Sequence, residues 1–80
     1  MKEWEERKAL KEKYKGNLAV VKYIQWLNGV IETAQRNYTK AEKKQVRIYY
    51  KNRIDAYQSC LRMVLLNTGY NFKEVLDVPV

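Results

Sequence analysis

The sequence predicts a small all-α protein: an antiparallel helical hairpin with a coiled-coil-like seam, which dimerises into a four-helix bundle. Three observations support this prediction. Proline is absent before Pro79, helix-favouring residues fill the chain, and apolar residues recur at helical spacing in two long segments. A chain of 80 residues is long enough for one small domain. Residues 1–80 are therefore expected to form a single helical domain.

The first helix is expected over about residues 3–38. Its apolar residues have a mean spacing of 3.5 positions, the period of a left-handed coiled coil; they are Leu10, Tyr14, Leu18, Val21, Ile24, Leu27, Ile31, Ala34 and Tyr38. Gly16 interrupts this stripe, and glycine costs about 1 kcal/mol relative to alanine inside a helix. The stripe keeps its register across the glycine, which favours a continuous or kinked helix. The alternative is a separate short helix over residues 2–15.

The second helix is expected over about residues 40–67. Thr39-Lys40-Ala41-Glu42 has the capping-box pattern, in which a threonine and a glutamate satisfy free amides at a helix N-terminus. Gly69 stands where a helix commonly ends in the left-handed conformation, and a short turn over residues 71–76, capped by Asn71, follows. The apolar arc of this helix consists of Val46, Tyr49, Tyr50, Ile54, Tyr57, Cys60, Leu61, Val64 and Leu65.

Two amphipathic helices alone would leave half of each apolar stripe exposed, a larger patch than monomers usually carry. Dimerisation would cover it; the alternative is a monomeric three-helix bundle, in which the N-terminal segment folds back. Arg53 is the charged residue of the predicted seam, and Glu32, from the same chain or a dimer mate, is its expected partner. The residues predicted to form the core or dimer seam are Leu10, Tyr14, Val21, Ile24, Leu27, Ile31, Tyr38, Val46, Tyr50, Arg53, Ile54, Tyr57, Leu61 and Val64.

Positive charge is concentrated near the expected turn, since residues 39–54 carry +5 of the net +7. This excess predicts a basic stripe on one side of the second helix, made of Lys40, Lys43, Lys44, Arg47 and Lys51, with Arg62 further along. Such a stripe suits an acidic protein surface or nucleic-acid phosphates, and the alternative is a solvated face that serves solubility.

Aromatic residues are the second functional feature of the sequence. Trp4, Trp26 and Tyr49 are candidate interface residues, because tryptophan and tyrosine dominate the binding energy of many protein interfaces. The alternative for the two tryptophans is that they seal the rim of the core.

Histidine is absent, there is one cysteine, and no glycine-rich phosphate loop occurs, so neither a catalytic centre nor a metal or cofactor is expected. Arg53-Ile54-Asp55-Ala56-Tyr57 resembles the start of the helical chorismate mutases, but the supporting positions of that family do not follow it. We expect a non-catalytic binding or regulatory protein that acts stoichiometrically on an acidic protein partner. This composition is typical of phage and mobile-element accessory proteins. The alternative is sequence-independent binding of nucleic acid through the basic stripe.

The compartment is predicted from two further observations. A lone cysteine suits a reducing environment, and the chain has no run of about 18 apolar residues, the length that a membrane span requires. We therefore expect a cytoplasmic protein without a membrane partner.

Overall fold

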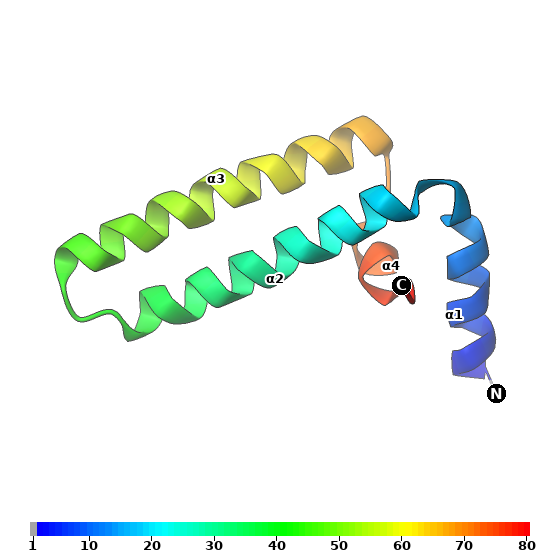
Figure 1. The fold of residues 1–80 in the computed structure, drawn as a ribbon, viewed down its shortest axis with the longest axis horizontal. Helices are drawn as coiled ribbons and strands as arrows, with labels where there is room; N and C mark the ends of the chain where they lie inside the picture. The colour runs from blue at the N-terminus through cyan, green and yellow to red at the C-terminus, as the bar shows by residue number, and fades with distance from the viewer. Residues whose placement is uncertain (1) are drawn as a thin grey trace.

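The computed structural model describes residues 2–80, and every regular element in that range is a helix. Two long helices, α2 (Leu18–Lys40) and α3 (Lys44–Thr68), lie side by side and antiparallel (Figure 1). They are preceded by α1 (Lys2–Lys13) and a 3₁₀ turn, η1 (Lys15–Asn17), and are followed by the short α4 (Phe72–Asp77). The all-α prediction is confirmed for this range.

The molecule is flat. Its principal extents are 47 × 29 × 15 Å, and a helix with its side chains is about 10–12 Å wide, so the α2–α3 hairpin is a single layer of helices. Both α1 and α4 lie at the end of the hairpin away from the turn that joins α2 to α3 (Figure 1). The α1 helix packs on α4 and runs across this end, so it does not extend along the hairpin as the third helix of a bundle would.

The expectation of one continuous or kinked first helix is wrong, and the alternative of a separate short helix is confirmed, because α1 ends at Lys13 and α2 begins at Leu18. The turn is closed by the amide of Asn17, which donates to the carbonyl of Tyr14 over 2.9 Å. Tyr14 is thereby turned into the core, where it is 4% exposed and its ring lies edge-on to Tyr70 at 4.9 Å. The apolar stripe keeps its spacing across the break, but its first members pack on α4 and the C-terminal segment instead of along α3.

The predicted capping box at Thr39 is also wrong. The hydroxyl of Thr39 donates to the carbonyl of Gln35 over 3.0 Å, a bond to the preceding turn that threonine makes readily inside a helix. The α2 helix therefore continues to Lys40, and α3 begins at Lys44, four residues later than expected. Lys43 takes the N-cap position and makes no side-chain capping bond within residues 2–80.

Gly69 and Asn71, at the far end of α3, have the capping roles that the sequence predicts. Gly69 has φ 69°, and its amide donates to the carbonyl of Leu65 over 2.9 Å. The side chain of Asn71 accepts a hydrogen bond from the amide of Glu74 over 3.1 Å, which caps α4.

The core is centred on α2 and is most complete at the end that α1 and α4 cover. Val21, Ile24 and Val75 are fully buried there, together with Tyr14 and Val78. The side-chain amide of Gln25 donates to the carbonyls of Val75 and Val78 over 2.8 and 2.9 Å, which ties the C-terminal segment to α2.

Within the described residues 2–80, α3 has no fully buried residue. Leu61 and Val64 pack partly buried on the core cluster, and Ile54, Tyr57 and Tyr50 are half-buried. Two predicted seam residues are exposed instead: Val46 and Arg53. Within the chain, Arg53 does not meet Glu32, whose carboxylate accepts from the side chain of Asn28 over 3.3 Å, and the pairing with Glu32 of a dimer mate stays a prediction.

Candidate functional site

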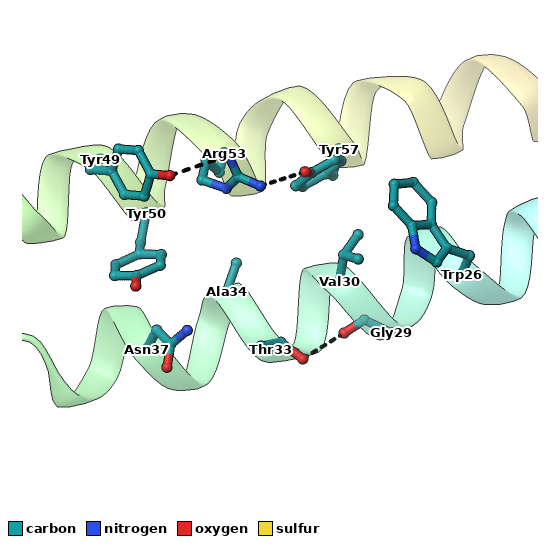
Figure 2. A pocket seen from close by; sticks show the side chains of 10 residues that line it. All are labelled: Trp26, Gly29, Val30, Thr33, Ala34, Asn37, Tyr49, Tyr50, Arg53 and Tyr57. Carbon is teal, nitrogen blue, oxygen red and sulfur yellow. Dashed lines mark hydrogen bonds between the residues drawn. The ribbon is translucent and has the colours of Figure 1, made fainter.

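A groove of about 550 Å³ lies between α2 and α3 (Figure 2), and none of its lining residues comes from α1 or α4. Apart from Trp26 at one end, its α2 wall carries small or medium-sized side chains, among them Gly29, Thr33 and Ala34. Its α3 wall carries large ones. We call this hollow the aromatic groove; its ten lining residues are Trp26, Gly29, Val30, Thr33, Ala34, Asn37, Tyr49, Tyr50, Arg53 and Tyr57.

Arg53 is the one charged side chain that lines the groove, and two tyrosines hold it in place (Figure 2). Its guanidinium donates to the hydroxyl of Tyr49 over 3.3 Å and to that of Tyr57 over 2.6 Å. The same group lies 5.5 and 5.3 Å from the centres of the two rings, within cation–π distance. Because tyrosine hydroxyls are neutral, this arrangement orients the positive charge without neutralising it.

Exposed aromatic rings form the rim of the groove. Trp26 is 54% exposed; it stacks on Tyr23 at 6.2 Å and meets Tyr57 edge-on at 6.0 Å. On the α3 side Tyr49 is also 54% exposed and packs edge-on to Tyr50 at 5.1 Å. Such rings are rigid and largely apolar, and they remain open to solvent in this chain.

A second hollow extends the apolar surface toward the end of α3; it is lined by Tyr23, Ser59, Cys60, Met63, Val64 and Asn67. Tyr23 belongs to this hollow and stacks on Trp26 of the groove, so the two share an edge. On a 100° helical wheel, Tyr49, Arg53, Cys60 and Met63 fall within about 80° of one another. The hollows therefore form one strip along α2 and α3.

The basic residues lie elsewhere. Lys40 is the last residue of α2 and Lys43 lies in the turn, so these two fall outside the second helix, whereas Lys44, Arg47 and Lys51 share one face of α3 within about 60°. All members of the predicted stripe are exposed, and none lines the aromatic groove. The guanidinium of Arg47 lies 5.2 Å from the ring of Tyr38, and Lys51 is two residues before Arg53 but about 160° away on the wheel. We call Lys40, Lys43, Lys44, Arg47 and Lys51 the basic tip.

Two other predicted site residues stand apart from both surfaces. Arg62 is exposed on α3, eleven residues beyond Lys51 and thus about 16 Å further along the helix. Trp4 is 65% exposed on α1, with the ammonium of Lys8 over its ring at 5.4 Å. Of the three candidate interface aromatics, the fold brings Trp26 and Tyr49 together and leaves Trp4 apart.

A polar cluster that the sequence did not predict joins α1 to α4. The carboxylate of Glu74 accepts hydrogen bonds from the ammonium of Lys13 and the hydroxyl of Tyr14, each over 2.8 Å. The bond from Lys13, with a second from Tyr14, holds the pKa of Glu74 below its ordinary value. Burial, followed by the bond to Glu74, raises the pKa of Tyr14. This cluster fixes the position of α1 and lies outside the groove.

Sequence reasoning placed Tyr50, Arg53 and Tyr57 in the core or seam and so missed the groove that they line. A signal for it was present in the sequence. Arg53 has a tyrosine four residues before it and another four residues after it, the spacing at which helical side chains meet.

Comparison of this chain with protein families, curated proteins and solved structures found no match. Within residues 2–80, no helix is both long and apolar enough to span a membrane, and no group of three His, Cys, Asp or Glu residues is arranged to hold a metal ion. A function therefore has to be inferred from the surfaces just described.

Proposed function

We propose that this protein is a non-catalytic binding protein that captures a segment of a partner protein, stoichiometrically, in the aromatic groove. The observation that carries the proposal is the strip of exposed aromatic rings around a fixed arginine. Trp26 and Tyr49 are each 54% exposed, and they flank an arginine whose hydrogen-bond partners among residues 2–80 are the hydroxyls of Tyr49 and Tyr57. Tryptophan, tyrosine and arginine are the residue types that most often dominate the energy of protein interfaces.

A second copy of this chain suits the groove less well than a different protein. A two-fold dimer formed through this face would place the same lining residues on both sides of the interface. None of these lining residues is an aspartate or glutamate, so Arg53 would be buried without a counter-charge. We therefore assign the groove to a heterologous partner. The homodimer predicted from the sequence is a separate question, which sedimentation equilibrium at micromolar concentration answers.

The basic tip supports a second candidate function, the sequence-independent binding of nucleic acid. Five cations gather around the turn between α2 and α3, and clustered lysines and arginines bind phosphates by releasing counterions. Proteins that bind single strands also stack bases on aromatic rings beside the cations. Here the exposed rings of the groove and the cations of the tip lie on different sides of α3, which favours the protein partner.

The test is a pull-down from the organism that encodes the protein, quantified for three baits. The baits are the wild type, a groove variant with Trp26→Ser and Tyr49→Ser, and a tip variant with Lys43→Glu, Lys44→Glu and Lys51→Glu. Circular dichroism must first show that all three are equally helical. We expect a protein that the wild type and the tip variant capture and the groove variant loses.

Two results would contradict the proposal. Retention of the same partners by the groove variant would show that the groove is not the binding surface. Loss with the tip variant alone, together with DNA binding that weakens steeply as salt increases, would favour the nucleic-acid function. As part of the proposal we place the protein in the cytoplasm, where the exposed thiol of Cys60 would remain reduced.

A further inference from the structure

Building on the proposed function, we propose that the aromatic groove binds an acidic amphipathic α-helix, which lies along α2 and α3 and places a carboxylate on Arg53. The partner helix would complete a three-helix bundle with the hairpin. Shape, length and charge support this proposal independently.

The shape of the groove suits a helix. Its walls are two helices whose backbone amides and carbonyls bond internally, so they offer no free edge to which an extended strand could add. On the α2 wall, Gly29 and Thr33 lie one turn apart, and a Cβ atom built on Gly29 would have no heavy atom within 4 Å. Small side chains four residues apart let a second helix approach closely, as in ridge-and-groove packing.

The length of the exposed strip sets the length of the ligand. Along α3, the exposed large side chains of the two hollows run from Tyr49 to Met63, a distance of 14 residue steps or about 21 Å. A partner helix of about four turns covers this distance. Its apolar side chains, repeating every three or four residues, would contact Trp26 at one level and the hollow beside Met63 at another.

Charge identifies the chemistry of the ligand. Two of the five N–H groups of Arg53 bond to tyrosine hydroxyls, which leaves donors on the guanidinium for an incoming group. The ion pair found among the described residues joins Lys13 and Glu74, away from the groove, so Arg53 has no carboxylate of its own chain. A carboxylate on the partner would supply a charge-assisted bond in a partly apolar site.

The protein as a whole also selects an acidic partner. Its net charge is +7, and the basic tip lies at the end of the hairpin where α2 and α3 are joined. This field would speed the encounter with a negatively charged helix, with an effect that added salt screens. A nucleic-acid strand is a poorer occupant, because Arg53 is the one cation lining the groove and no charged residue lines the second hollow.

The experiment is a selection from a displayed library of random 16-residue peptides on the folded wild-type protein, with counter-selection on the variant Trp26→Ser/Tyr49→Ser. We expect enriched peptides with apolar residues at i, i+3 or i+4, and i+7, and with an Asp or Glu among them. Their far-ultraviolet circular dichroism should show added helix on binding. Enriched peptides that are proline-rich, basic or without helical spacing would overturn the inference while leaving the proposed function standing.

A charge exchange tests the contact with Arg53 directly. Replacing the shared carboxylate of the enriched peptides by its amide should weaken binding about tenfold or more, and so should Arg53→Gln. The two changes together should weaken binding little more than either one alone. Selection on Arg53→Glu should instead enrich Lys or Arg at that peptide position. Lys51→Gln is the matched control, since it removes the same charge from the opposite side of α3; its effect should stay within about twofold and should vanish at high salt.

Two outcomes distinguish the contact with Arg53 from the proposed binding function. Equal effects of Arg53→Gln and Lys51→Gln would show that only net charge matters, which overturns the Arg53 contact. If no peptide is enriched and the pull-down partner is retained by the groove variant, the proposed function fails as well.

Discussion

The two ends of the α2–α3 hairpin differ in how completely their side chains are covered. At the closed end, defined by Tyr14, Val21, Ile24, Val75 and Val78, side chains from four segments meet and the aliphatic ones are almost completely buried. At the open end, around the aromatic groove, only α2 and α3 are present, and Tyr49 on α3 is 54% exposed. Leu27, Ile31 and Ala34 are buried along the rest of the hairpin, but the residues that line the aromatic groove come from α2 and α3 alone.

This difference indicates where stability and binding reside. Burial of apolar area stabilises the fold by about 25 cal/mol per Å², so the closed end should carry most of the free energy of unfolding. The open end retains exposed apolar area that a partner can bury. Mutations at the two ends should therefore have separable effects on stability and on binding.

The largest difference in the free energy of unfolding should be between mutations of two isoleucines, one fully buried and one half-exposed. Ile24→Ala, at a fully buried position, should lower the free energy of unfolding by about 2–5 kcal/mol, because it leaves a cavity in the core. Ile48→Ala, at a position that is 49% exposed on α3, should change it by about 0.5 kcal/mol or less. Urea denaturation followed by circular dichroism measures both.

If Ile24→Ala does not fold, Ile24→Val provides the same comparison with an expected loss of about 0.5–1.5 kcal/mol. Equal losses at positions 24 and 48 would mean that the closed end does not dominate stability.

The next prediction concerns the polar tie at the closed end. Gln25→Ala removes the donors to the carbonyls of Val75 and Val78 and should cost about 1–3 kcal/mol. It should also speed hydrogen exchange at the α4 amides before those of α2. Gln35→Ala, at an exposed position on α2, is the control and should leave both measurements unchanged. Unaltered α4 exchange in Gln25→Ala would contradict the role of this side chain.

Two glycines should respond to alanine with opposite signs. Gly69→Ala forces an L side chain into the left-handed region at φ 69° and should cost about 1–2 kcal/mol. Gly29→Ala lies inside α2 and should stabilise the free protein by about 0.5–1 kcal/mol. In each case, a Cβ atom would lie within 4 Å of no heavy atom of the described residues other than its chain neighbours and nearby helix backbone. Steric clashes within the chain therefore do not affect the comparison.

Gly29→Ala also tests the groove, because a helix that approaches the α2 wall closely would meet the added methyl group. Thermal denaturation should show the increase in stability, while titration with an enriched peptide should show weaker binding. Binding that is unchanged or stronger would argue against close helix packing at Gly29.

The smallest effect should come from the cluster of Lys13, Tyr14 and Glu74. The pKa of Glu74 is lower in the folded protein than in the unfolded chain, so its contribution to stability is present above its ordinary pKa and is lost as pH falls through the folded-state value. Because this pair is exposed, the change should be slight and should affect mainly the docking of α1. Glu74→Gln should remove this acidic-pH dependence from the hydrogen exchange of α1. If the variant still shows the pH dependence, another carboxylate is its cause.

Much of the secondary structure could be predicted from the sequence, because its causes lie within a few residues. The left-handed glycine at position 69 bonds to Leu65, and Asn71 caps the amide of Glu74; both interactions span three or four residues. Local chemistry also has its limits. The hydroxyl of Thr39 can cap a new helix or bond back to the carbonyl of Gln35, and the local sequence allows both.

The sequence alone determined the helical class, the hairpin and the end of α3, since helix propensity, spacing and capping act along the chain. Only the tertiary structure decided that the first helix breaks at Tyr14, which requires Glu74 and Tyr70 more than 50 residues away. It also decided that Arg53 lies in an open groove. Periodicity shows which residues share a face of a helix, but the length and position of neighbouring helices determine which part of that face is covered.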